Sequence, residues 1–466
     1  MQVTPDPNPA LASARWLRRL ERTGRPLYLA LVQALEAAIR DGELQPGEQL
    51  PPQRAVAELL GVDFTTVTRA YGAARARGLV EGAVGRGTFV RSGAGEDEAG
   101  LVDLSMNLPP PPQGLSLASA LKTTITAILG RTDAATLMAY HPGAGTLGQK
   151  AAGATWLAPC LGEVAPERVL VCPGVQTGLA ALLAVLAKRG ETLIVEPLTY
   201  PGLKAVAEQQ GLRLAACQVD AEGFVPEALE RLCASERPAA IYVIPTTQNP
   251  TASTMGLARR RAVAQIAEAA GVWLIEDDPY SRLFDAPLPA LASLAPSRTF
   301  HLATLSKSLT PGLRIAFMVT PVGEIGERVA EGLRAIGLMA SPLMAAVAAS
   351  WIREGVAADL LDGIRRETRA RRQIAAEILP TARGAAEGMH VWLDLPGSPA
   401  PAQLRLAAQQ RGLSVVTADA FAAGDAYPNG IRISLGGPAK QLVLRDALGK
   451  MADLLGGAPG PRRMIV

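Results

Sequence analysis

The sequence has few of the residues that build metal sites and disulfide frameworks. It holds only four cysteines, without CxxC spacing, and three scattered histidines in 466 residues. Both facts argue against a disulfide framework and against a zinc or other metal site. No apolar run approaches the roughly 18–20 residues needed to cross a bilayer, and the N-terminus lacks the basic start and apolar stretch of a secretory signal. We therefore expect a cytoplasmic protein with no membrane partner.

Lysine is also scarce, with seven lysines against 39 arginines. One of the seven, Lys307, lies between Ser306 and Ser308, and Arg314 follows seven residues later, next to an apolar run. Partial burial and a cationic neighbour lower the pKa of a lysine amine, and hydroxyls with an arginine can hold a phosphate. This setting suits a lysine that forms a Schiff base with an aldehyde cofactor. A solvated lysine in a serine-rich loop is the alternative for this segment taken alone.

Positive charge is concentrated near the N-terminus. Residues 11–92 hold twelve arginines and no lysine against eight acidic residues, whereas the rest of the chain is near neutral. This balance permits nucleic-acid binding without proving it. Small and acidic residues after Arg91, and the four prolines 109–112, predict a linker over residues 93–112. The chain is thus expected to form a domain over residues 11–92 and a larger one over residues 113–458.

The N-terminal domain is expected to contain three helices and a two-stranded ribbon. Apolar spacing predicts helices over residues 26–39, 51–61 and 64–77, and strands over residues 79–81 and 88–90. Gly61 and Gly78 stop the second and third helices. The turn at residues 61–63 is short enough to place the third helix across the second, so this order indicates a winged helix-turn-helix.

This domain resembles the GntR family of bacterial transcription regulators. The matching segments are residues 26–28, 42–51, Arg54, 66–67, 70–71, 78–79 and 85–90. The resemblance implies contacts with a double-stranded DNA operator from Arg54, Thr65, Thr66, Arg69, Arg86 and Gly87. Hydroxyls and arginines at a helix N-terminus reach phosphates and base edges, and a glycine turn lets a wing approach the DNA backbone. A plain surface role is the alternative for Arg54 and Arg69. Phe64 departs from the family, which often has an arginine there, so a contact is lost or the ring packs on a thymine methyl.

Beyond residue 101, short β-branched runs alternate with helices rich in alanine and leucine. The predicted strands cover residues 169–171, 192–195, 240–244 and 272–275. This alternation predicts a mostly parallel, doubly wound α/β sheet with its site at the C-terminal ends of the strands. Polar segments follow each strand: a glycine that opens a helix, as a phosphate needs, then Tyr200, then an amide at Asn249. The last one, Glu276 to Tyr280, has a carboxylate three residues before a phenol.

This ordered set resembles the aspartate-aminotransferase-like enzymes of fold type I, over roughly residues 101–458. The resemblance implies a PLP-dependent transferase fold with a small C-terminal α+β subdomain, and pyridoxal 5'-phosphate (PLP) as cofactor in an internal aldimine on Lys307. Asp277 would pair with the pyridine nitrogen, and Asp278 is the weaker alternative. The other cofactor contacts that it implies are Asn249 and Tyr280 at the phenolic oxygen, Tyr200 on the ring, and Gly174, Val175, Gln176, Thr304, Ser306 and Arg314 around the phosphate.

The same resemblance implies contacts with substrate and with a second subunit. Tyr140 would reach into the neighbouring site of a homodimer. Arg432 would clamp a substrate α-carboxylate, for which its bidentate fork is suited, although a plain surface-strand arginine is the alternative. Two positions depart from the fold's usual residues: Gln149 replaces an arginine and Ala252 replaces a glycine.

A GntR-type domain fused to an aminotransferase-like domain is the layout of the MocR subfamily of regulators, which this chain resembles over nearly its whole length. The resemblance implies a PLP-dependent transcription regulator that senses a small amino-compound effector, or PLP itself, through the aldimine on Lys307. The alternative is an active aminotransferase with an auxiliary DNA-binding domain. The site residues do not separate the two, because the same residues serve both. The completeness of the N-terminal domain, wing included, favours the regulator.

Overall fold

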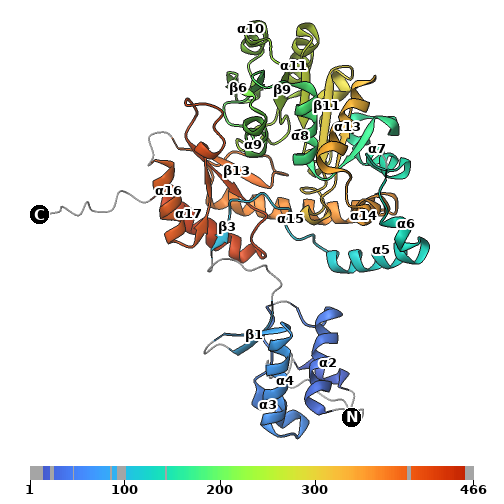
Figure 1. Ribbon diagram of the computed structural model, residues 1–466. Coiled ribbons are helices and arrows are strands. Elements are labelled where there is room, and N and C mark those ends of the chain that lie inside the picture. The colour runs from blue at the N-terminus through green and yellow to red at the C-terminus, as the bar shows by residue number, and fades with distance from the viewer. Residues whose placement is uncertain are drawn as a thin grey trace, which may run out of the picture. The chain divides into compact units, whose positions relative to one another are not determined.

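The chain divides into two compact units, residues 1–99 and 100–466 (Figure 1). The computed structural model describes residues 14–20, 26–45, 47–83, 87–91, 101–141, 144–395 and 400–456. Each unit buries its own hydrophobic residues, with Trp16, Leu35 and Val67 in the first core and Val171, Leu182 and Phe317 in the second.

The N-terminal unit is the predicted winged helix-turn-helix. Its elements are the 3-10 helix η1 (Arg15–Arg19), helices α2 (Leu27–Arg40), α3 (Gln53–Leu60) and α4 (Phe64–Ala76), and strands β1 (Val80–Ala83) and β2 (Gly87–Val90). Gly61 ends α3 with φ of 62°, a left-handed conformation that costs glycine little, and this allows the sharp turn into α4. The buried Tyr71 of α4 donates its hydroxyl to Pro51 O at 2.8 Å and so ties α4 to the start of α3. Strands β1 and β2 pair antiparallel.

The larger unit is built on a seven-stranded sheet in the order β4-β12-β11-β10-β9-β5-β6. The strands are β4 (Val169–Cys172), β5 (Thr192–Val195), β6 (Arg213–Ala216), β9 (Ala240–Val243), β10 (Trp273–Asp277), β11 (Thr299–Thr304) and β12 (Ala316–Val319). Strand β12 runs antiparallel to both β11 and β4, and the other described pairings in this sheet are parallel. The prediction of a mostly parallel sheet is therefore confirmed.

Helices cover both faces of this sheet, as the predicted doubly wound fold requires. Successive strand residues alternate between two cores: Leu193 and Tyr242 belong to one, Ile194 and Ile241 to the other. The first core takes residues from α7 (Leu147–Leu161), α8 (Val175–Leu186), α9 (Pro201–Gln210), α13 (Ile325–Gly337) and α14 (Pro342–Arg353). The second takes residues from α10 (Pro226–Glu236), α11 (Leu257–Ala270) and α12 (Leu291–Leu294).

A smaller C-terminal subdomain has its own core. Strands β13 (His390–Asp394), β15 (Val416–Thr417) and β16 (Gly430–Ser434) form an antiparallel sheet. Helices α15 (Val356–Ile378), α16 (Pro401–Gln410) and α17 (Gln441–Gly456) bury Ile374, Leu404 and Leu444 with it. This is the small α+β subdomain that the fold type I resemblance implies.

Residues 101–112 fold as part of the larger unit, although their prolines predict a linker. Strand β3 (Val102–Asp103) pairs in parallel with β14 (Leu413–Ser414), and Leu104 is buried in the C-terminal core. The part of the predicted linker from residue 93 to 100 lies outside the described residues. Other elements of this unit are α5 (Leu117–Arg131), α6 (Ala134–Leu137), β7 (Val219–Asp220) and β8 (Gly223–Phe224). No helix among the described residues is long and apolar enough to span a membrane.

Candidate functional site

A cavity of about 520 Å³ lies where the parallel strands of the large sheet end. Strands β10 and β11 lead into it through Asp277 and Lys307, and Tyr200 and Asn249 follow β5 and β9. Eleven of the residues predicted to bind cofactor or substrate line this one cavity: Val175, Gln176, Tyr200, Asn249, Asp277, Tyr280, Thr304, Ser306, Lys307, Arg314 and Arg432. They span more than 250 residues of sequence, so the fold alone brings them together.

Lys307 follows β11 in a turn, with its side chain partly buried. Its Nζ donates to the backbone oxygen of Asn107 at 2.5 Å. Burial lowers the pKa of the amine to about 8, and the nearby charges of Arg432 and Arg314 act in the same direction. Because roughly a tenth of a group with this pKa is neutral at pH 7, Lys307 can act as a nucleophile under ordinary conditions.

The two neighbouring carboxylates at the end of β10 face different surroundings. Asp277 lines the cavity and accepts the hydroxyl of the buried Tyr242 at 2.6 Å. Burial raises the pKa of Asp277 to about 6, and the charge of Asp278 adds to this increase. Asp278 instead accepts the backbone N–H of Ser281 at 3.0 Å and also the hydroxyl of Ser281. Asp277 is thus the carboxylate that faces the cavity, as the spacing to Tyr280 suggests.

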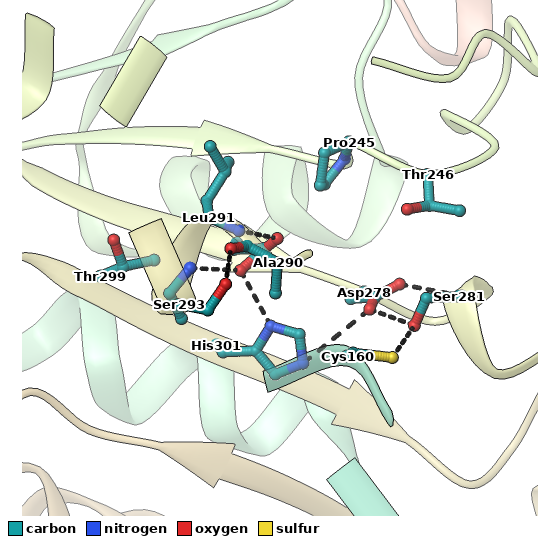
Figure 2. A network of polar contacts seen from close by, with 12 residues as sticks. Cys160, Pro245, Thr246, Asp278, Ser281, Ala290, Leu291, Ser293, Thr299 and His301 are labelled. Atoms are coloured by element: carbon teal, nitrogen blue, oxygen red, sulfur yellow. Dashed lines mark hydrogen bonds and ion pairs between the residues drawn. The ribbon is translucent and has the colours of Figure 1, made fainter. Parts of the chain in front are cut away.

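A buried polar network supports this strand end (Figure 2). His301, from β11, contacts Glu276 at 2.9 Å through Nδ1 and Asp278 at 3.9 Å through Nε2. Burial disfavours a charged imidazole, but Glu276 outweighs it, and the pKa of His301 is raised. Ser281 continues the network to Cys160, whose Sγ lies 3.1 Å from the serine hydroxyl. The contacts of His301 with Glu276 and Asp278 link β11 to the end of β10, next to Asp277 in the cavity lining.

The phosphate-binding end predicted from the sequence lies at the start of α8. Gly174 has φ of 88° and precedes the first helical residue, Val175. The left-handed φ favours glycine here, and a Cβ at position 174 would lie 2.8 Å from the Arg314 guanidinium and displace it. The hydroxyl of Thr304 donates to Ser306 at 2.9 Å, and both line the cavity. A helix N-terminus, two hydroxyls and an arginine suit a phosphate group.

Arg432 also lines the cavity and is only 7% exposed. It donates to Asn249 Oδ1 at 2.6 Å and to the backbone oxygen of Ser105, and its guanidinium lies 5.0 Å from the Phe421 ring centroid. Among the described residues, its Nε has no hydrogen-bond partner, and neither has Asn107 Oδ1. Unsatisfied buried polar atoms are rare in folded proteins. These two therefore fit a cavity built to receive a polar ligand.

One polar cluster of the site was not predicted from the sequence. Asn107 donates its Nδ2 to the Tyr280 hydroxyl at 3.0 Å, and the same nitrogen lies 3.0 Å from His390 Nδ1. Burial lowers the pKa of His390 to about 3, so the ring is neutral and accepts at Nδ1, while Nε2 donates to Gln248 O at 3.1 Å. Nothing in the spacing of Asn107 or His390 marks them. Tyr242 was also not predicted, but the sequence carried one signal for it, because a phenol in a buried strand requires a hydrogen-bond acceptor.

Tyr140 is 79% exposed and does not line the cavity of its own chain. Its predicted place in the site of a second subunit stays a prediction. Gln149 caps α7 with its side chain, accepting from Thr146 N at 3.0 Å. Ala252 adopts φ of 57°, the left-handed conformation that explains why glycine is usual there.

In the N-terminal unit, the predicted DNA contacts lie on α3, α4 and β2. Arg54, Thr65, Arg69 and Gly87 are exposed and Thr66 is half-buried; Arg86 lies outside the described residues. Asp63 caps α4 and accepts both the backbone N–H of Thr65, at 2.8 Å, and its hydroxyl. The Arg69 guanidinium lies 4.1 Å from the Tyr28 ring centroid. Phe64 is 44% exposed at the first position of α4, and Arg54 lies 5.9 Å from its ring.

Comparison with known proteins matches both units. The family of aminotransferases of class I and II matches residues 99–444, and the gntR family of bacterial regulatory proteins matches residues 27–90. The uncharacterized HTH-type transcriptional regulator YdeF of Bacillus subtilis is 32% identical over 451 residues, which cover 94% of this chain and 96% of that protein. The probable rhizopine catabolism regulatory protein MocR of Rhizobium meliloti is 31% identical over 378 residues, or 73% of this chain and 74% of that protein. This chain belongs to the MocR subfamily of GntR regulators.

A solved structure extends the comparison for the larger unit. The α-aminoadipate aminotransferase LysN of Thermus thermophilus, complexed with N-(5'-phosphopyridoxyl)-L-leucine, superimposes with a TM-score of 0.69 at 25% identity. The match covers 77% of this chain and 92% of LysN. The predicted MocR-type architecture, a winged helix-turn-helix joined to a fold type I aminotransferase domain, is thus confirmed, and transcription regulation is favoured over transamination.

Proposed function

We propose that this regulator holds PLP in the cavity through Lys307, and that an amino compound entering the same cavity alters its binding to DNA. The observation that supports this most is that Lys307, Asp277, Arg314 and Arg432 line one cavity. The N-terminal unit adds a complete helix-turn-helix with exposed arginines.

Each part of the cofactor has a counterpart in the cavity. When bound, PLP supplies an aldehyde for the amine of Lys307 and a pyridinium ring that withdraws electrons. Asp277 would keep the ring nitrogen protonated, and Tyr242 would orient that carboxylate. Arg314, Thr304, Ser306 and the start of α8 would hold the phosphate. Asn249 and Tyr280 would contact the phenolic oxygen, and Tyr200 would lie on the ring.

The effector is proposed to be a small amino compound with a carboxylate. Arg432 is buried, charged and free of a carboxylate partner among the described residues, so an anionic ligand would compensate its charge. We further propose a homodimer, in which Tyr140 of each subunit reaches the neighbouring cavity. Two helix-turn-helix units would then bind two half-sites of one operator.

Borohydride labelling tests the cofactor part of this proposal. The full chain incubated with PLP and reduced should carry one phosphopyridoxyl group on the peptide containing Lys307, detected by mass spectrometry. Lys307→Ala should lose the label completely, whereas Lys204→Ala, the removal of another partly buried lysine, should keep it. An unchanged label in Lys307→Ala would place the cofactor on a different lysine.

DNA binding and transamination are measured on the same preparation. The regulator proposal predicts specific binding to a duplex selected from a random pool, with an affinity that changes when PLP and an α-amino acid are added. The likeness to LysN favours a second activity, amino-group transfer. Steady release of a 2-oxo acid over many turnovers, without any effect on DNA binding, would make the aminotransferase the better description.

A further inference from the structure

Three successive backbone carbonyls, those of Ser105, Met106 and Asn107, are each held by a side chain of the larger unit. Arg432 donates to Ser105 O, the Ser434 hydroxyl donates to Met106 O at 2.7 Å, and Lys307 Nζ donates to Asn107 O at 2.5 Å. Two of the three donors are the residues proposed to bind the ligands of the cavity. Ser434 lies outside the cavity lining.

A turn at residues 103–106 orients the three carbonyls toward these donors. Asp103 Oδ1 accepts from the backbone N–H of Ser105 at 2.7 Å, from its hydroxyl at 2.6 Å, and from the N–H of Met106 at 3.3 Å. Just before the turn, Leu104 N donates to Ser414 O at 2.9 Å. A Cβ on Gly437 would lie 2.5 Å from Asp103 O, so the backbone of this loop packs directly against the segment. The turn therefore has one defined position, set by backbone packing and by the three donors.

Lys307 cannot keep all its donors while it holds an aldehyde. A protonated amine has three N–H groups. When its nitrogen bonds to the aldehyde carbon, two of these hydrogens leave with the aldehyde oxygen as water, and one N–H remains. The remaining N–H would have two candidate acceptors, Asn107 O and the phenolic oxygen of the cofactor. Asn107 O would lose its donor when the phenolic oxygen takes this N–H.

Arg432 faces a similar competition at the other end of the segment. Its Nη1 and Nη2 donate to Asn249 Oδ1 and Ser105 O. A carboxylate bound in the bidentate manner takes two N–H groups of the same guanidinium and forms stronger, charge-assisted bonds than a backbone carbonyl does. The two ligands together thus compete for two of the three contacts that hold residues 105–107.

We propose that residues 105–107 sense the loading of the cavity: ligands that engage Lys307 and Arg432 release this segment, and the release alters the DNA-binding unit to which it is joined. The larger unit begins at residue 100, so the segment lies within its first eight residues and directly follows the DNA-binding unit along the chain. This inference rests on the proposed function, because it requires PLP on Lys307.

Hydrogen exchange on the full chain tests the release. Peptides covering residues 101–112 report chiefly on the N–H groups before the four prolines. Adding PLP should speed exchange of the N–H groups of residues 104–108 by at least about threefold, the sign of lower local stability. Ser434→Ala removes the donor that no ligand competes for and should add to this effect. Asp133→Ala is the matched control, because Asp133 caps Thr136 N at 2.8 Å in the same unit, away from the segment.

Measurements of DNA affinity test whether the release of residues 105–107 alters DNA binding. For the wild-type chain, affinity for a duplex selected from a random pool should differ by about tenfold or more between samples without and with PLP plus an α-amino acid, since allosteric coupling is commonly of this size. In Asp103→Ala the turn is loosened at all times, so the ratio should fall toward one while the PLP absorbance is retained. Asp133→Ala should keep the wild-type ratio.

The outcomes of these experiments distinguish this inference from the proposed function on which it rests. If PLP labels Lys307 but exchange at residues 104–108 is unchanged, or Asp103→Ala keeps the full ratio, the sensing role is overturned and the proposed function stands. If PLP does not label Lys307, both are overturned.

Discussion

The two units handle their charged residues in opposite ways. In the N-terminal unit Arg54 and Arg69 lie exposed on helix surfaces, where DNA phosphates would meet them in water. In the larger unit Asp277 and Arg432 are less than 10% exposed and face a cavity. Charges interact weakly in water and salt, and strongly where solvent is excluded. One substitution should therefore have a small effect on the surface of the first unit and a large effect in the cavity of the second.

Arg432→Ala should give the largest effect and test the cavity side of this comparison. Removing a buried charged contact typically costs roughly a hundredfold or more in affinity. The variant should retain the visible absorbance of bound PLP and lose that much affinity for an α-amino acid, measured by spectral titration. Arg405→Ala, which removes an arginine paired with Asp419 at 2.8 Å, should titrate normally. A normal titration of Arg432→Ala would mean that the effector lacks a carboxylate or that another arginine holds it.

Burial of Lys307 should also change how its rate of reaction with PLP depends on pH. Only the neutral amine of Lys307 attacks an aldehyde, and its pKa is lowered from 10.5 to about 8. The rate of PLP attachment, followed by absorbance, should rise about tenfold per pH unit below this value and level off above it. The reaction of PLP with N-acetyl-lysine methylamide, whose amine is solvated, should continue to accelerate up to a pH of about 10. The same behaviour in the protein would show that the amine is not shielded from water.

Arg54→Ala should have a smaller effect, because it tests a charge in water. DNA affinity should fall about five- to tenfold, similarly for all duplexes, and the salt dependence should lose about one unit of slope, as expected for one phosphate contact. Arg77 is the matched control, since it is on the same unit but is paired with Glu36 at 3.4 Å. A change in sequence preference in Arg54→Ala would instead indicate a base contact.

The smallest expected effect is a change in the stability of each unit when one glycine is replaced. Gly61 and Gly271 end helices in the left-handed conformation with open space around them, so alanine at either position adds strain without a clash. Each change should cost about 1 kcal/mol. By calorimetry, the melting transition of the small N-terminal unit should fall by about 4–8 °C, and that of the larger unit by about 2 °C or less. Gly72→Ala, inside α4, should not lower either transition; equal shifts in both units would contradict the size argument.

The sequence located the regular elements well where local signals were strong. Residues 192–195 form the strand predicted from them, and the third helix of the N-terminal unit begins at the predicted Phe64. Strand β3 was missed because two residues have no periodicity, and only the partner strand β14 makes them a strand. The end of the linker was misplaced for the same reason: the prolines suggested irregular chain, whereas the anchors of residues 101–107 come from residues far away in the sequence.

The order of polar segments after strands was enough to predict most of the cavity, since parallel strands end at one edge of a sheet. Lys307 is marked by its residue type and its neighbours, Asp277 by its spacing to Tyr280, and Arg432 only by the resemblance to fold type I enzymes. The contacts that these residues make are not marked in the sequence. That Asp277 accepts from Tyr242, that Arg432 and Lys307 donate to carbonyls of residues 105–107, and that His390 is neutral depend on distances between residues far apart in the sequence. Local periodicity determines elements and their order, but pairing, burial and the resulting pKa values arise only when the tertiary structure removes these groups from water.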